Sequence, residues 1–275
     1  MDQIFNRPEV QSAVLPFIIA FTLYLALRKL TANAWIWAVF VAFLVSAGLI
    51  NGLTLTPLTG TRKIILLILV SFVIAGSVQH LITNIKTRRA LFTVLAVSAF
   101  LVVFWKIAIR MEVTEMAVFF AGSLGLILFL LWAFERIRDH KPQFHGAGFS
   151  LLLGTGLSAS LGASALLGQL ALSLSAASGA VLLGWVIKGN TGKGNHSGLP
   201  YALAAALIGL AAVILARLPW YALIPLASIP LLTSFVPKIS ETRFTNALVS
   251  SLPGLLIALA VSFWVWQTGS SSSGY

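Results

Sequence analysis

The stretch GTGLSASLGASALLGQLALSLSAASGAVLLG, residues 154–184, decides the fold class of this chain. It has no charged residue, and 20 of its 31 residues are glycine, alanine, serine or threonine. It belongs to an uncharged segment of 41 residues, 147–187. As one α-helix rising about 1.5 Å per residue, this segment would be about 60 Å long, roughly twice the ~30 Å hydrocarbon core of a bilayer. We therefore predict two membrane-spanning helices that join at Gly168-Gln169.

The small residues of this stretch are predicted to form helix-packing surfaces rather than a flexible linker. Leucine, valine and isoleucine occur throughout, whereas a solvated linker rich in glycine and serine carries mainly polar residues. Glycine, alanine and serine also recur at a spacing of four, which lets two helix backbones approach closely in lipid. The positions concerned are Gly154, Ser158, Gly162, Ala176, Ala180 and Gly184.

The composition indicates an integral membrane protein. Hydrophobic residues make up 59% of the chain and charged residues only 9%, whereas soluble domains carry about 25% charged residues. The formal net charge is +11, but the 18 lysines and arginines are scattered in small groups between apolar runs. This distribution is typical of charges that orient a membrane protein, so we expect no nucleic-acid partner. The chain has no cysteine, which excludes disulfides, thiolate metal sites and cysteine nucleophiles.

Ten apolar runs are long enough to cross a membrane as helices, since a span takes about 17–25 residues. Runs such as IILLILVSFVIAG lack the polar–apolar alternation of a barrel strand. We therefore predict an all-α polytopic transmembrane helical bundle in a single domain, 1–275, with possible halves 1–140 and 141–267 and a polar flexible tail, 268–275. The predicted spans are 10–27, 35–51, 64–84, 90–106, 116–134, 147–167, 170–187, 200–217, 219–236 and 246–267.

Basic residues differ in number between the two sets of predicted connections. The odd-numbered connections carry 12 of the 18 lysines and arginines, and the other side carries the remaining six. Because cytoplasmic loops are enriched in these residues, we expect both termini to face outward. In composition, the chain resembles polytopic inner-membrane proteins of Gram-negative bacteria. We therefore expect a multi-pass protein of a bacterial inner membrane, with both termini in the periplasm.

Ser178, in the sequence AASGA, and the segment HLITN, residues 80–84, invite comparison with the rhomboid intramembrane proteases. Those enzymes carry a Gly-x-Ser-Gly motif and a His-x-x-x-Asn segment. Ala176 stands where the motif has glycine, and the one downstream histidine, His196, lies in a predicted loop. A serine nucleophile needs a base within hydrogen-bond reach. We therefore predict no protease and no other enzyme, and we interpret Ser178 as a helix-packing residue.

Neither a metal site nor a cofactor is predicted. His140 and His145 lie in the sequence RDHKPQFH, which we expect to be a solvated loop. A metal ion needs three or four converging ligands, and Asp139 is the one acidic residue beside these histidines.

All seven acidic residues are predicted to lie at termini, helix ends or loops. Because charges inside the membrane mark ion pathways and proton relays, this pattern disfavours a pump that uses its own carboxylate. Neutral polar side chains and two prolines that interrupt a late span remain as candidates for a binding vestibule. They are Gln79, His80, Asn84, Gln169, Pro225 and Pro230. Hydrogen bonding between helices is the alternative role of the polar members.

Two functions are compatible with these observations. A non-catalytic subunit or scaffold, which packs with other membrane-protein subunits or with its own copies, is favoured by the small-residue faces and by the lack of charges inside the spans. A transporter or facilitator of a small solute or lipid is the alternative, favoured by the ten spans and by the prolines of the late helices. In either role the chain contacts membrane lipids.

Overall fold

The chain is all-helical, as predicted. The computed structural model describes residues 7–52, 56–82, 84–189, 196–237 and 242–271, and no strand occurs within these ranges. The π-helical turn η1 continues into α2, and the 3-10 turn η2 continues into α10. The elements are η1 (Val10–Val14), α2 (Leu15–Leu27), α3 (Ala34–Asn51), α4 (Gly60–Leu81), α5 (Ile85–Ala108), α6 (Val113–Ile137), α7 (Lys141–Gly162), α8 (Ala165–Lys188), α9 (Leu199–Ala216), η2 (Trp220–Ala222), α10 (Leu223–Ser234) and α11 (Arg243–Ser271).

Each predicted apolar run overlaps a helix or one of the two continuous pairs, although the run 147–167 extends through the turn after α7 into α8. Within the described ranges, eight helical segments are long and apolar enough to cross a membrane. The pair η2 and α10 is shorter, Trp220–Ser234, and α7 contains many glycine, serine and other polar residues. α11 continues to Ser271, into the segment predicted as a flexible tail, and residues 272–275 lie outside the described part.

The composition of α7 matches its position inside the bundle. It packs against α6, α8, α9, α10 and α11, and its contacts with α8 and α11 are the most extensive of any helix pair. A helix enclosed by other helices requires close backbone packing more than an apolar surface toward lipid. α9 is enclosed in the same way by α4 to α8, and 78% of its residues are buried.

The hairpin turn predicted at Gly168-Gln169 is wrong in position, because the turn forms five residues earlier, at Ala163-Ser164. Both backbone N–H groups of this turn donate to the carbonyl of Ala159, at 3.0 and 2.7 Å. Gly168 lies inside α8, where a Cβ atom would overlap Ser160 of α7. This glycine therefore serves a close approach of two helices and not the reversal of the chain.

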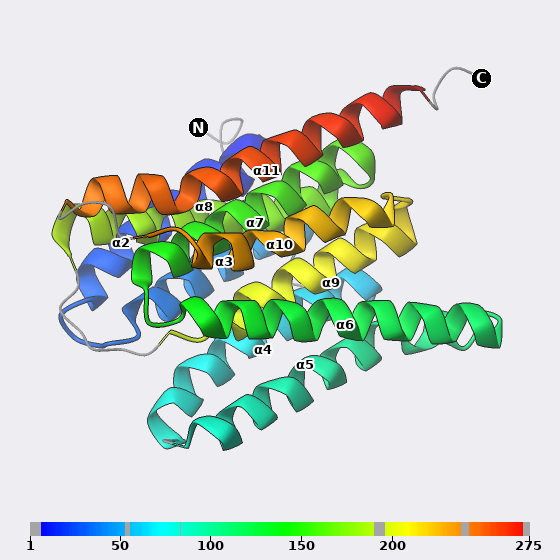
Figure 1. Cartoon of the computed structure of the whole chain (residues 1–275), viewed down its shortest axis with the longest axis horizontal. Helices are drawn as coiled ribbons and strands as arrows, with labels where there is room; N and C mark the ends of the chain where they lie inside the picture. Colours follow the sequence, from blue (N-terminus) through cyan, green and yellow to red (C-terminus); the bar gives the residue numbers. More distant parts are fainter. Residues whose placement is uncertain (1–6, 53–55, 83, 190–195, 238–241, 272–275) are drawn as a thin grey trace.

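Figure 1 shows the helices running back and forth between two ends of the bundle. The C-terminal ends of α2, α4, α6, α8 and α10 lie toward the left, and the turn between α7 and α8 lies at the opposite end. We refer to the left end as the basic end, because most of the described lysines and arginines lie at the helix ends on this side. They include Arg28, Lys86, Arg89, Arg136, Arg138, Lys141 and Lys188.

Candidate functional site

The basic end gathers charged side chains from the start of α5 and the end of α6. Asn84 caps α5, because its side-chain oxygen accepts a hydrogen bond of 2.9 Å from the backbone N–H two residues later. This start places Arg88 and Arg89 close to the N-terminus of α5, while Glu135 and Arg136 lie in the last turn of α6. Because α5 and α6 pack together and run in opposite directions, the four side chains meet at one end.

Glu135 is shared by two arginines. Its Oε2 atom accepts hydrogen bonds from Nε of Arg89 at 3.1 Å and from Nη1 of Arg138 at 3.2 Å. Nε of Arg138 also lies 3.5 Å from Oδ1 of Asp139. The side chains of Glu135 and Arg138 are mostly buried, at 13% and 18% exposure, so solvent and salt screen this pair less than an exposed pair.

Arg88 adds a buried positive charge to this group. Its exposure is only 4%, and it forms no hydrogen bond or ion pair with the described part of the chain. Glu135 attracts its guanidinium at longer range, while Arg89 and Arg138 repel it. A buried charge without a direct partner is costly. With Arg136, the group contains four arginines against Glu135 and Asp139, and this excess of positive charge favours an anion.

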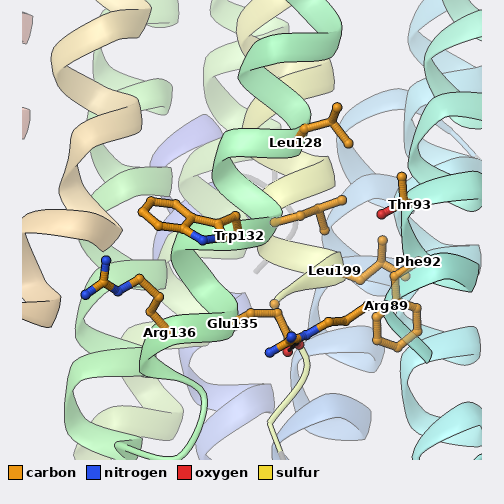
Figure 2. A pocket seen from close by; sticks show the side chains of 10 residues that line it. Arg89, Phe92, Thr93, Leu128, Trp132, Glu135, Arg136 and Leu199 are labelled. Atoms are coloured by element: carbon orange, nitrogen blue, oxygen red, sulfur yellow. Dashed lines mark hydrogen bonds and ion pairs between the residues drawn. The ribbon is translucent and has the colours of Figure 1, made fainter. Parts of the chain in front are cut away.

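A pocket of about 260 Å³ opens beside these charges, between α5, α6 and the start of α9. Figure 2 shows its two contrasting ends, with Arg89 and Glu135 at one end and Leu128 at the other. Trp132 lies between them, where its ring can contact both a polar and an apolar part of a ligand. The pocket is therefore amphipathic. It is lined by Arg89, Phe92, Thr93, Leu128, Leu131, Trp132, Glu135, Arg136, Gly198 and Leu199.

Arg136 differs from the other three arginines of this group in its partners. Its guanidinium carbon lies 5.2 Å from the ring centre of Trp132 and 5.8 Å from that of Phe235, which follows α10. These cation–π contacts hold the charge in place and leave its N–H groups without an acceptor among the described residues. Figure 2 shows this guanidinium on the side of Trp132 away from Arg89, so Arg136 can meet an anionic group at the exposed rim of the pocket.

A second polar cluster lies inside the bundle, near the same end. The Ser178 hydroxyl donates to the hydroxyl oxygen of Tyr201 at 2.9 Å, and that oxygen lies 3.5 Å from Nδ1 of His145. The three side chains come from α8, α9 and α7 and are all buried. The expectation of a solvated loop is therefore wrong for His145, although His140 is exposed before the start of α7.

The helix α7 begins six residues before the predicted span, and this explains the burial of His145. Pro142 lies in the first turn of α7, a position that suits proline because the first helical N–H groups have no intrahelical partner. The next turn then carries Phe144 and His145 against Trp35 of α3, with ring centres 5.4 and 5.3 Å apart. Proline after a charged connection was the one signal in the sequence that pointed to this earlier start.

The residues predicted to form a polar vestibule lie at several places. Asn84 caps α5 at the basic end, whereas the half-buried Gln169 lies near the start of α8, at the opposite end. The side chains of Gln79 and His80, in α4, lie outside the described part. Pro225 lies in the first turn of α10 and Pro230 inside it. The structure therefore does not bring Asn84, Gln169 and the two prolines to one site.

The small residues of α7 face α10 and α11 of the same chain. A Cβ atom on Gly154 would lie 2.9 Å from Cβ of Ala258 in α11, and one on Gly162 would also overlap α11. Between them, the hydroxyl oxygens of Ser158 and Ser262 lie 3.5 Å apart. This face of α7 is therefore covered by helices of the same chain.

The small residues of α8 are also packed within the chain, though less uniformly. A Cβ atom on Gly184 would lie 2.6 Å from the ring of Tyr24 in α2. Ala180 is fully buried. Ala176 is half-buried and lines an apolar groove between α2, α7, α8 and α11.

No protein family and no curated protein matches this chain. The function must therefore be inferred from the geometry and charge of the pocket itself.

Proposed function

We propose that this protein binds an anionic amphiphile, such as a phospholipid with a net negative headgroup, and acts as its transporter or facilitator. The observation that carries the proposal is the amphipathic pocket between α5, α6 and α9. It combines an excess of arginine at one end with leucine and aromatic side chains at the other. Basic pockets between membrane helices on the cytoplasmic side are suited to anionic lipid headgroups.

The size of the pocket limits which part of the ligand it encloses. Pockets that enclose a whole drug-sized molecule have about 300–1,000 Å³, and this pocket has about 260 Å³. It is large enough for a phosphate group and the polar backbone next to it. The acyl chains would remain outside, along the exposed apolar side chains of α5 and α6, such as Val94, Val102 and Val118.

The placement in the membrane is part of the proposal. All ten helical segments span the membrane, including α7 and the pair of η2 and α10, which other helices surround. The basic end faces the cytoplasm, and both termini face the periplasm of a bacterial inner membrane. In this orientation the pocket opens at the level of the inner leaflet, where Arg89 and Arg136 meet the lipid headgroups.

The non-catalytic subunit or scaffold, the other function predicted from the sequence, has one support fewer. It rested on small-residue faces that could receive a partner helix, but Gly154, Gly162 and Gly184 face helices of the same chain. We propose no chemical reaction, because the pocket offers charge and shape but no nucleophile positioned beside a base.

Substitutions of Arg136 and Glu135 test the charge of the ligand. Arg136→Gln is expected to reduce the retention of an anionic phospholipid about five- to tenfold, because one charge-assisted contact is lost. Glu135→Gln is expected to increase it, because this carboxylate competes with the ligand for Arg89 and Arg138. Native mass spectrometry of the purified protein, with anionic and zwitterionic phospholipids of equal chain length, measures both effects.

Arg110→Gln is the matched control, because Arg110 is exposed at the opposite end of α5. It should leave lipid retention unchanged. Leaflet exchange of a fluorescent anionic phospholipid in proteoliposomes then tests transport. Equal retention of anionic and zwitterionic lipid by the wild-type protein would contradict binding, whereas selective retention without exchange would contradict transport alone.

A further inference from the structure

A small, partly open cavity lies at the basic end, where α2, α3, α7 and α8 meet the segment that precedes α9. Its volume is about 10 Å³. Such a space holds a single particle the size of a water molecule or a halide ion, and it is too small for a phosphate group. The side chains around it include Arg28, Trp35, Lys141, His145, Trp185 and His196.

The wall of this cavity is rich in hydrogen-bond donors. Arginine, lysine and tryptophan side chains donate and cannot accept, and four of the ten lining residues belong to these types. No aspartate or glutamate is among the ten. A water molecule needs acceptors for its own two protons, whereas an anion uses donors only. Tyr24, Thr31 and the two histidines of the wall can also accept, but two cationic side chains without a carboxylate give the wall a positive charge, and this charge favours an anion over a water molecule.

Trp35 provides an independent indication of a missing acceptor. Its side chain is 2% exposed, and its Nε1–H group has no acceptor among the described residues. The ring is fixed by stacking on His196, with centres 5.5 Å apart and planes at 6°, and by an edge contact with His145. Because buried N–H groups are almost always paired, we expect an acceptor for the Trp35 N–H in the cavity that this side chain lines.

The cationic side chains around the cavity come from two helices. Nη1 of Arg28, which follows α2, donates to the carbonyls of Lys188 and Gly189 at 3.0 and 3.3 Å. This positions the guanidinium against the end of α8. Lys141 is the first residue of α7. An anion between these two charges would link the ends of α2, α7 and α8.

We propose that this cavity binds a single inorganic anion of chloride size, which accepts the Trp35 N–H and joins the ends of α2, α3, α7 and α8. The site is independent of the amphiphile pocket, because its volume excludes a lipid headgroup. Its role is structural: the anion neutralises adjacent positive charge and fixes the helix ends that surround the cluster of His145, Tyr201 and Ser178.

Thermal unfolding of the full-length protein in detergent tests this site. Chloride is titrated against gluconate, which is too large for the cavity, at constant ionic strength. A ligand that binds only the folded state raises the unfolding temperature with its concentration. We therefore expect a higher unfolding temperature in chloride than in gluconate, with a concentration dependence that a single-site isotherm describes.

Two variants assign the effect to this cavity. Trp35→Phe removes the N–H but keeps an aromatic ring, and Lys141→Met removes the charge but keeps the length of the chain. Each is expected to raise the apparent dissociation constant for chloride about tenfold, the value of one charge-assisted hydrogen bond. Trp105→Phe and Lys106→Met are matched controls, since both residues are exposed near the opposite end of α5, and they should respond like wild type.

Two results would overturn the proposal. The first is an equal unfolding temperature in chloride and gluconate for the wild-type protein. The second is a wild-type chloride response in Trp35→Phe, which would place the anion elsewhere on the protein. If Lys141→Met does not fold, Trp35→Phe and the wild-type titration still decide the question.

Discussion

Two serines of α8 show how much the role of a buried hydroxyl depends on its partner. Ser173 and Ser178 are both fully buried. The Ser173 hydroxyl donates to the carbonyl of Leu170 in its own helix at 2.8 Å, whereas the Ser178 hydroxyl donates to Tyr201 in α9 at 2.9 Å. Only the second bond joins two helices. The sequence predicted Ser178 as a packing residue, and its hydrogen bond gives it a role beyond small size.

Replacement of each serine by alanine should change the free energy of unfolding by different amounts. Ser178→Ala is expected to lower the free energy of unfolding by about 1 kcal/mol, because the Tyr201 hydroxyl loses a buried partner. Ser173→Ala should have a smaller effect, because its hydroxyl bonds only within one helical turn. Chemical unfolding in detergent, in a double-mutant cycle with Tyr201→Phe, should give a coupling energy of about 0.5–1.5 kcal/mol for Ser178. Additive effects of the two substitutions would show that the bond contributes nothing.

At the scale of elements, the helices were predictable and the tightest turn was not. Charged residues separate most apolar runs, so the order and approximate limits of the helices follow from the sequence. No charge or proline marks the turn at Ala163-Ser164, because the whole segment from 147 to 187 has the same uncharged composition of small and apolar residues. Gly168 was mistaken for a turn residue because the same lack of a Cβ atom that suits a turn also suits a close helix contact.

Two glycines in different helices allow a direct test of close packing. Gly154 of α7 faces Leu226 and Ala258, whereas a Cβ atom on Gly122 of α6 would have no neighbour within 4 Å. Gly154→Leu should lower the free energy of unfolding by at least about 1–3 kcal/mol, because the larger side chain separates α7 from α10 and α11. Gly122→Leu should leave stability unchanged or raise it slightly, since glycine disfavours a helix. Thermal unfolding and membrane abundance measure the effect of each variant. Equal losses of stability in the two variants would contradict a close contact of Gly154 with α10 and α11.

At the scale of the whole molecule, the charged and polar groups that can bind a ligand lie toward one end. Part of this was predictable, because α5 and α6 form an antiparallel hairpin and so bring Arg89 close to Glu135. The contribution of Gly198 and Leu199 to the pocket was not predictable, because it depends on where α9 packs relative to that hairpin. The sequence therefore identified these arginines as orienting charges, and three-dimensional packing revealed them as part of a pocket.

The orientation of the molecule can be tested with single cysteines, since the chain has none of its own. Thr87 and Thr114 are both exposed and lie near opposite ends of the bundle, at the start of α5 and the start of α6. Because basic residues favour the cytoplasmic side, we expect a membrane-impermeant maleimide to label Thr114→Cys in intact cells with a permeable outer membrane. Thr87→Cys should react only after lysis, and Gln267→Cys, near the end of α11, should react like Thr114→Cys.

Labelling of Thr87→Cys in intact cells would reverse the orientation and move the arginine pocket to the outer leaflet. Protection of Gln267→Cys alone would leave the pocket in place but remove one span between α6 and α11, and α10 with its internal Pro230 would be the segment that fails to cross.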